Sequence, residues 1–233
     1  MSDNNQQPRN PNLGDLANLP SDLLSGDVVK QALNMSSKFA GEFEIRYQTA
    51  LDLVVDKLKF IDRSYQLEHD VKLIDSLQHR IKTLESIMEK IQRKGLIKQP
   101  AEIRNKIRDI AGVRVITKFL TDIETVHQLI KDQPDIEIVQ EKDYIRYPKP
   151  NGYQSLHLIV EVPIYLSTGT ERIPVEIQIR TIAMNFWASL EHELNYKKDV
   201  DNKEQLRDDL RRKADDITKL DVEMDQIRQK LRK

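Results

Sequence analysis

The chain has 233 residues, of which 39% are hydrophobic and 32% charged, a balance that suits one globular domain with a packed core and helical extensions. It contains no cysteine, which excludes disulfides, thiol catalysis and thiolate metal sites. The formal net charge of −1 predicts no global attraction to nucleic acid or anionic lipid, and the five histidines lack the helical spacing of zinc ligands.

The first segment predicts a flexible N-terminal region over residues 1–35. Residues 1–18 are rich in Asn, Gln and Pro, so their burial cannot offset the entropy lost on ordering, and a short helix is expected from about residue 20 to 34. The N-terminus lacks the basic and apolar regions of a signal peptide, and no apolar run approaches the roughly 18 residues of a spanning helix. We therefore expect a cytoplasmic protein without membrane contacts.

The central residues, from about 36 to 200, predict one domain. Apolar residues between Phe39 and Tyr65 recur every three or four positions, which predicts a long amphipathic helix packed against a sheet. Runs rich in β-branched residues predict strands, and helical patterns separate them. The strands are expected at 113–117, 156–162 and 173–179, and the helices near 83–94, 121–132 and 181–197. This mixture predicts an α/β or α+β domain around one sheet.

Basic residues near position 80 form a pattern suited to phosphate groups. On a strand that ends here, Arg80 and Lys82 share one face. On a helix that follows, Ser86, Lys90 and Arg93 fall at i, i+4 and i+7, on one stripe. Lysine charges, a forked guanidinium and donors near a helix start together suit a triphosphate. The alternative interpretation is a basic helix face in contact with water.

A loop before the next predicted strand carries Asp109, and the strand itself carries Arg114. Magnesium prefers carboxylate oxygens and keeps several waters, so Asp109 is a candidate ligand. Gly112 permits close approach of the backbone to a ligand. The alternative makes Asp109 an ordinary turn residue with a salt bridge to Arg108.

The segment from Lys142 to His157 has the features of a base-stacking loop. Residues 150–152 are Pro-Asn-Gly, which predicts a tight turn, and Tyr153 follows beside Lys149. An exposed ring at this junction is a platform for a nucleobase. His157 lies on the strand that follows, on the face opposite its apolar neighbours. The alternative interpretation buries Tyr153 and satisfies His157 with a local hydrogen bond.

The last predicted strand alternates polar and apolar residues. Glu176, Gln178 and Arg180 share one face, and the helix that follows carries Asn185. Glu176 is suited to share a metal with Asp109, because paired carboxylates often hold Mg²⁺ between nucleotide phosphates. A structural strand at a solvent-facing surface would show the same alternation.

The C-terminal region, residues 201–233, predicts a charged amphipathic helix. Apolar residues stand three or four apart for most of its length, with charges between them: Leu206, Leu210, Ile217, Leu220, Met224, Ile227 and Leu231. Two interpretations remain open. The helix packs on the flank of the domain, or it forms an interface between subunits.

Four motifs follow one another along the chain. They are Arg80-x-Lys82-x-x-x-Ser86-x-x-x-Lys90; Arg108-Asp109-Ile110-Ala111-Gly112-Val113-Arg114; Asp143-Tyr144-Ile145 with Pro148-Lys149-Pro150-Asn151-Gly152-Tyr153-Gln154-Ser155-Leu156-His157; and Glu176-Ile177-Gln178-Ile179-Arg180-Thr181 running into Phe186-Trp187-Ala188-Ser189-Leu190-Glu191-His192. Together they resemble the synthetase domain of RelA/SpoT-type enzymes over roughly residues 40 to 200. Because 233 residues leave no room for a hydrolase domain or a long regulatory region, we expect a small alarmone synthetase of the RelP/RelQ group.

The resemblance implies an α+β fold with a mixed central sheet flanked by helices, of nucleotidyltransferase type. It implies a cytoplasmic (p)ppGpp synthetase of the stringent response, a homotetramer that uses Mg²⁺. In such an enzyme the ribose 3′-oxygen of GDP or GTP attacks the β-phosphorus of ATP, and AMP leaves.

The resemblance also implies a role for each matching residue. Adenine would lie between Arg80 and Arg114, and the ATP phosphates on Lys82, Ser86, Lys90 and Arg93. Asp109 and Glu176 would hold Mg²⁺ and activate the hydroxyl. Guanine would stack on Tyr153, with Lys149 and His157 near the acceptor phosphates and Gln178 and Asn185 positioning the guanosine. Some relatives carry Arg where this chain has Lys142, so that phosphate contact is not carried over.

Two rival functions remain at this point. Some relatives in toxin systems pyrophosphorylate the 3′ end of tRNA, which calls for an extended basic surface, whereas the tail and the C-terminal helix here are mixed in charge. A non-catalytic nucleotide or RNA sensor on the same fold would be expected to lose its metal and phosphate residues first, and Asp109, Glu176, Lys82 and Lys90 are all present. Regulation by RNA stays open.

Overall fold

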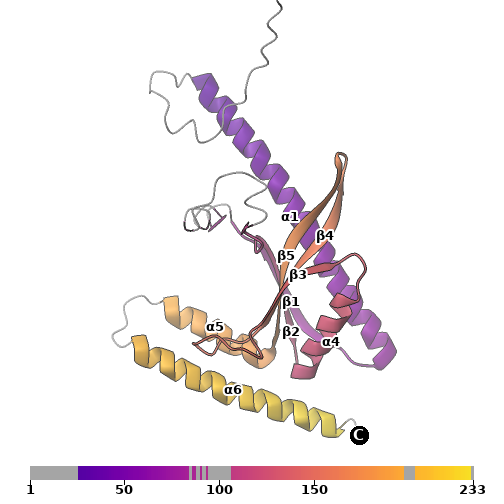
Figure 1. Ribbon diagram of the computed structural model, residues 1–233, viewed down its shortest axis with the longest axis vertical. Coiled ribbons are helices and arrows are strands. Elements are labelled where there is room, and N and C mark those ends of the chain that lie inside the picture. The colour runs from indigo at the N-terminus through magenta and orange to yellow at the C-terminus, as the bar shows by residue number, and fades with distance from the viewer. Residues whose placement is uncertain are drawn as a thin grey trace, which may run out of the picture.

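The computed structural model describes residues 26–83, 86, 87, 90, 93, 106–196 and 203–231, so the tail expected over residues 1–18 lies outside the described residues. The elements follow in a fixed order, with labels as in Figure 1. They are α1 (Gly26–His69), β1 (Ile74–Ile81), β2 (Ala111–Thr117), α4 (Leu120–Lys131), β3 (Glu137–Asp143), β4 (Leu156–Leu166), β5 (Gly169–Thr181), α5 (Ile182–Tyr196) and α6 (Lys203–Leu231).

One long helix covers a segment for which the sequence predicts two. α1 runs unbroken from Gly26 to His69, across the boundary expected at residue 35, so the short helix expected to end near residue 34 is part of α1 in the described residues. Its inner face is buried at helical spacing by residues that include Leu51, Val55 and Leu58. The chain leaves the helix through Asp70, whose φ of 52° is left-handed.

The five strands form one mixed sheet in the order β1-β2-β5-β4-β3. β2 and β5 run parallel, and the other neighbouring pairs are antiparallel, which confirms the predicted α+β class. One face of the sheet is covered by α1 and α4, whose side chains share a core with Val113, Val115 and Ile177 (Figure 1). β3 was not predicted, because its charged sequence hides the alternation of a strand.

The register of the strands places the predicted polar residues together on the opposite face. Gly112 of β2 pairs with Arg80 on one side and with Glu176 on the other. Two residues further along, Arg114 pairs with Gln78 and Gln178. Paired residues of neighbouring strands point to the same side of a sheet, so this face collects the polar side chains of three strands.

α6 lies along α5 and reaches α4 at its far end (Figure 1). The indole nitrogen of Trp187 donates to the carbonyl of Leu210 at 2.9 Å, and the hydroxyl of Thr181 donates to Asp221 at 2.6 Å. The inner face of α6 therefore packs on the domain, as one of the two interpretations predicts. Its outer face exposes the apolar residues Leu220, Met224, Ile227 and Leu231. None of the helices in the described ranges combines the length and apolar content that crossing a membrane requires.

We predict that Arg228→Ala loosens α6 from the domain. Arg228 donates to Asp122 of α4 at 2.5 Å, and the two side chains are only 12% and 3% exposed. Removing one partner of a buried pair leaves the other charge in a poorly solvated place, so the free energy of unfolding should fall by about 3 kcal/mol, as measured by urea denaturation.

Lys213→Ala is the matched control for this measurement. Lys213 pairs with Asp216 on the same helix, but both side chains are largely exposed. Its urea midpoint should stay at the wild-type value because water solvates both charges. Equal midpoints for Arg228→Ala and Lys213→Ala would contradict the anchoring role of Arg228.

Candidate active site

A cavity of about 400 Å³ opens on the polar face of the sheet. Its lining comes from β1, β2, β5 and the segment before β2. Six of the lining residues are ones that the sequence predicts for nucleotide or metal binding, and Gln78 of β1 lies beside them: Arg80, Lys82, Asp109, Arg114, Glu176 and Gln178. The cavity therefore joins three of the four motifs, which are distant in the sequence.

The backbone fixes Lys82 and Asp109 beside each other. The N–H of Lys82, just after β1, donates to the carbonyl of Ile110 at 2.8 Å, just before β2. The Lys82 ammonium pairs with Asp109, and the Lys90 ammonium donates to both oxygens of the same carboxylate at 2.5 and 2.6 Å. The salt bridge considered between Asp109 and Arg108 is replaced by these two lysine contacts.

Burial and charge act in opposite directions on this cluster. Burial alone would raise the pKa of Asp109, but the hydrogen bonds and charges of Lys82 and Lys90 outweigh it, so the pKa lies below its ordinary value. Burial lowers the pKa of Lys82 against the opposing effect of Asp109. Lys82 and Lys90 are 21% and 17% exposed, which contradicts a simple water-facing basic surface for these two residues.

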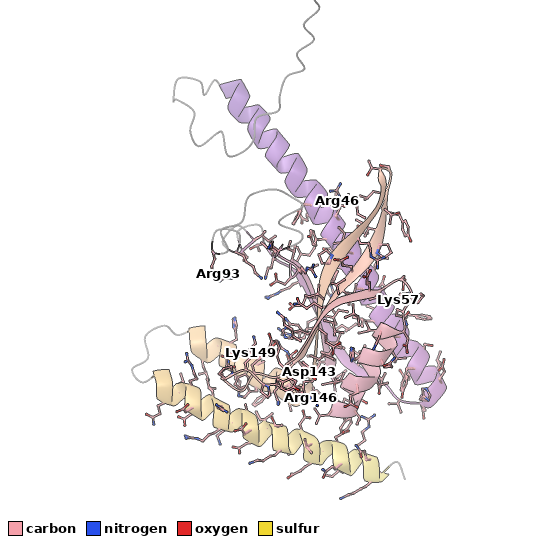
Figure 2. All side chains as sticks on the ribbon, viewed as in Figure 1. Arg46, Lys57, Arg93, Asp143, Arg146 and Lys149 are labelled. Carbon is pink, nitrogen blue, oxygen red and sulfur yellow. The ribbon has the colours of Figure 1, made fainter. Side chains whose placement is uncertain are left out.

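The remaining residues of the basic stripe are more exposed. Ser86, Lys90 and Arg93 are helical positions, as predicted, and Ser86 and Arg93 face water. The Thr83 hydroxyl donates to the Ser86 hydroxyl at 3.0 Å and accepts the Ser86 N–H at 3.3 Å, which forms the start of this turn. Figure 2 shows Arg93 and Lys149 on the side of the sheet away from Lys57 of α1.

Two arginines stand at one wall of the cavity, on neighbouring strands. Arg114 donates to Gln78 of β1 at 3.2 Å, and Arg80 lies two residues further along β1 on the same face. Burial lowers the pKa of Arg114, and the charge of Arg180 and then of Arg80 act in the same direction. Arg80 and Arg114 are therefore close enough for their charges to interact.

Glu176 is held by hydrogen bonds from two strands. His157 Nδ1 lies 3.2 Å from one carboxylate oxygen, and Gln178 Nε2 donates to the other at 2.9 Å. Burial alone would raise the pKa of Glu176, but the hydrogen bonds from His157 and Gln178 lower it below its ordinary value. The charge of Asp109 also acts on Glu176 and opposes that lowering, so the two carboxylates share one electrostatic environment.

The loop that carries Tyr153 is fixed by a tight turn. Gly152 has a φ of 91°, and a side chain there would come within 2.5 Å of Ala214 on α6, so both the turn and the packing require glycine. Asn151 donates to Glu191 of α5 at 2.9 Å and accepts the N–H of Tyr153 at 3.2 Å. Before the loop, Asp143 accepts the N–H groups of Ile145 and Arg146; Figure 2 labels Asp143, Arg146 and Lys149 in this region.

The structure agrees in part with each of the two interpretations of the Tyr153 ring. The ring is half-buried, and the Lys149 ammonium lies 4.7 Å from its centre. Its hydroxyl oxygen is 2.7 Å from His157 Nε2. The expected exposed platform is therefore only partly exposed, and His157 makes the local hydrogen bond of the structural alternative while it also contacts Glu176.

The structure does not gather every predicted residue into the cavity. Tyr153 and His157 adjoin it through Glu176 and Gln178, and Lys149 lies over the ring of Tyr153. Asn185 lies on α5, where its side-chain oxygen is buried without a hydrogen-bond partner among the described residues. Lys142, the departure from some relatives, is exposed on β3 and pairs with His157 across the ladder.

Two neighbours of the site carry no predicted role. Arg180 is only 4% exposed and donates to the hydroxyl of Tyr153 and to Gln178. Tyr144 packs edge-on against Tyr153 and His157, and Lys149 also lies 4.8 Å from its centre. The alternation of β5 predicts the face of Arg180, but no local pattern predicts these partners, because they come from distant segments.

The arrangement combines two ionised carboxylates with several cations around one cavity. Among the described residues, no group of three or more His, Asp or Glu side chains is placed to hold a metal. Asp109 and Glu176 alone still suit Mg²⁺, which is commonly held by one or two carboxylates together with substrate phosphates. The donor set therefore fits a metal–polyphosphate complex better than a bare metal ion.

Comparison with known proteins points the same way. The model of a family described as "Region found in RelA / SpoT proteins" matches residues 79–201. GTP pyrophosphokinase YwaC of Bacillus subtilis is 45% identical over 178 residues, which cover 76% of this chain and 85% of the relative. GTP pyrophosphokinase YjbM of the same organism is 37% identical over 207 residues, which cover 83% and 90%.

Solved structures of the same fold are similarly close. Small alarmone synthetase 1 from Bacillus subtilis, bound to its product pppGpp, superposes with a TM-score of 0.75 at 37% identity and covers 84% of this chain and 100% of its own. Small alarmone synthetase 2 from the same organism has a TM-score of 0.71 at 43% identity and covers 80% and 96%.

Proposed function

The chain belongs to the RelA/SpoT family, and on that premise we propose that it is a (p)ppGpp synthetase, a GTP diphosphokinase that transfers pyrophosphate from ATP to the ribose 3′-hydroxyl of GDP or GTP and releases AMP. The observation that carries this function is the cavity itself. It brings Lys82, Asp109, Arg114 and Glu176 together from three motifs, within a fold shared with synthetases of more than 30% identity.

The donor half of the site is assigned to ATP. Lys82 and Lys90 supply charge for its phosphates, with Ser86 and Arg93 further along the same stripe. Arg80 and Arg114 stand on neighbouring strands, which suits two guanidinium planes that hold an adenine between them. Support comes from the charges and their placement on one face of the sheet.

Magnesium is assigned to Asp109 and Glu176. Both carboxylates have lowered pKa values and are therefore ionised at neutral pH, as metal ligands must be. When bound, Mg²⁺ neutralises developing charge on the phosphates. Because Asp109 pairs with Lys82 and Lys90 in this structure, we expect a bound metal–nucleotide complex to redistribute these contacts, with the lysines on phosphate and Asp109 on the metal.

The acceptor half is assigned to GDP or GTP. Guanine stacks on the ring of Tyr153, beside Lys149, and His157 stands at the junction of the ring with Glu176. Gln178 and Asn185 are assigned to the guanosine. Support comes from the position of Tyr153, which puts a base next to the carboxylate that must reach its ribose.

Chemistry follows from this placement. Glu176 is the candidate that accepts the proton of the attacking 3′-hydroxyl, because it is ionised and lies in the cavity between the two halves. Asp109 is assigned a supporting role. Positioned cations and hydrogen-bond donors then stabilise charge in the transition state, which is the main contribution in phosphoryl transfer.

One assay tests the reaction class. Purified protein is mixed with ATP labelled at the β- or γ-phosphate, Mg²⁺ and either GDP or GTP. Labelled guanosine tetra- or pentaphosphate with stoichiometric AMP supports the proposal, and the ratio of the two products gives the acceptor preference. Product on the 3′ end of added tRNA, with none on free guanine nucleotide, would overturn it in favour of the tRNA-modifying alternative.

Glu176→Gln should abolish synthesis while ATP and GDP still bind. The amide keeps the size of the side chain but cannot take a proton or hold the metal charge, so the loss should fall on kcat, by at least about 100-fold. Calorimetry of nucleotide binding alongside turnover separates the two effects. Wild-type turnover in Glu176→Gln would contradict the assignment of Glu176 as the group that accepts the proton of the 3′-hydroxyl.

Tyr153→Ala should mainly weaken acceptor binding. Loss of base stacking costs about 1–3 kcal/mol, or roughly 5- to 150-fold in the affinity for GDP, while ATP binding changes little. Tyr165→Ala is the matched control, since that ring is 81% exposed near the turn between β4 and β5. Equal loss for ATP and GDP would mean that Tyr153 supports the fold instead of the base.

We also infer a homotetramer, in which the outer face of α6 contributes to a subunit contact. Leu220, Met224, Ile227 and Leu231 repeat in heptad spacing and are 47% to 82% exposed. Met224→Asp should therefore lower the molecular mass that sedimentation measures in solution. Gln226→Asp, which is exposed on the same helix but lies off this row, should leave that mass unchanged. A tetramer unaffected by Met224→Asp would place the contact elsewhere.

A further inference from the structure

Arg180 is a buried cation beside the acceptor half of the site. Its side chain reaches from the end of β5 to Tyr153 and Gln178, and the residue is only 4% exposed. Among the described residues it makes no ion pair, and its Nε is buried without a hydrogen-bond partner. A buried guanidinium with neutral partners is costly, which makes a purely structural role a poor explanation.

Two chains of hydrogen bonds, the two branches, run from Arg180 to Glu176. The contact with Gln178 sets the direction of the first branch. A guanidinium only donates, and an ionised carboxylate only accepts. Arg180 donates to Gln178 Oε1 at 2.9 Å, so the amide nitrogen is left to donate to Glu176 Oε2, also at 2.9 Å. The guanidinium of Arg180, which can only donate, and the carboxylate of Glu176, which can only accept, therefore decide which way the amide of Gln178 points.

The contact with Tyr153 sets the direction of a second branch. Arg180 donates to the phenol oxygen, and its positive charge favours a phenol hydrogen that points away from it. Among the described residues, His157 Nε2 is the ring nitrogen at hydrogen-bond distance from the phenol oxygen, at 2.7 Å. If Nε2 accepts this hydrogen, Nδ1 carries the ring hydrogen and donates to Glu176 Oε1 at 3.2 Å.

Both branches begin at the same nitrogen, Nη2 of Arg180, and end on the two oxygens of Glu176. We propose that Arg180 is a positioning residue, which directs the hydrogen bonds of Tyr153, His157 and Gln178 so that both oxygens of Glu176 are held as acceptors. The proposal rests on the proposed function only for its catalytic consequence. The direction of the hydrogen bonds is a property of the protein without substrate.

The tautomer of His157 tests the proposal directly. Protein with ¹⁵N-labelled histidine, free of nucleotide and Mg²⁺, is examined by long-range ¹H–¹⁵N correlation at neutral pH. The wild type should show His157 with its hydrogen on Nδ1. Arg180→Met removes the cation that turns the phenol hydrogen toward Nε2 and leaves Glu176 as the remaining group that favours hydrogen on Nδ1, so the population of the tautomer with hydrogen on Nε2 should rise.

Arg172→Met is the matched control, because Arg172 lies on the same strand and contacts Glu137 and the carbonyl of Glu161 away from the site. Its His157 signals should equal those of the wild type. A wild type with hydrogen on Nε2, or an Arg180→Met variant with an unchanged tautomer, would overturn the proposal.

Steady-state kinetics give the catalytic readout. Arg180→Met should lower kcat by about 10- to 100-fold, the usual loss for a residue that orients a catalytic group, with KM for ATP within about twofold. Arg180→Lys, which keeps a cationic donor, should restore part of the population with hydrogen on Nδ1 of His157 and part of the wild-type kcat. A loss of kcat without any change in tautomer would mean that Arg180 acts in another way.

Tyr153→Phe covers the case in which Arg180→Met fails to fold. It keeps the ring and its stacking surface but removes the phenol hydrogen that His157 Nε2 accepts. The same shift of tautomer is expected, and its absence would contradict the proposal. If the wild type makes no product in the assay above, the proposed function fails while the tautomer measurement still decides the role of Arg180.

Discussion

The parallel pairing of β2 with β5 is the constraint on which the site depends. Its register sets Gly112 opposite Glu176 and Arg114 opposite Gln178, while Val113 and Ile177 point into the core with almost no exposure. A shift of one residue would send Glu176 into the apolar layer under α1 and bring a valine or isoleucine to the cavity. Burial of the other face thus fixes the register, and the register places the carboxylate.

Charge compensation is the second condition, and it explains how so many cations share one cavity. Asp109 pairs with both Lys82 and Lys90 and so offsets one of their two positive charges, and Glu176 receives hydrogen bonds from His157 and Gln178. A polyphosphate can replace Asp109 as the partner of the lysines, and the freed carboxylate then suits a cation. Arg80, Arg114 and the two lysines still outnumber the two carboxylates, so the site stays positively charged without ligand and keeps the charge that a metal–nucleotide complex needs.

Much of this could be predicted from the sequence, and the omissions have physical causes. β2, β4 and β5 follow from runs of β-branched residues, and α4, α5 and α6 from helical periodicity. β3 lies at the edge of the sheet with mostly charged, exposed residues, so it lacks the alternation that marks a strand. The contacts of Asp109 with two lysines and of Arg180 with Tyr153 join distant segments, which local pattern does not encode.

The packing of α6 joins the loop that carries Tyr153 to the outer surface of the protein. Its inner face meets Gly152 through Ala214 and bonds Gln154 through Thr218 at 2.9 Å, so the turn before Tyr153 rests directly on this helix. Its outer face carries the exposed apolar row over residues 220–231, further toward the C-terminal end of the same helix. The turn before Tyr153 and the exposed apolar row thus lie on one continuous helix, and the position of Tyr153 depends on how α6 is held.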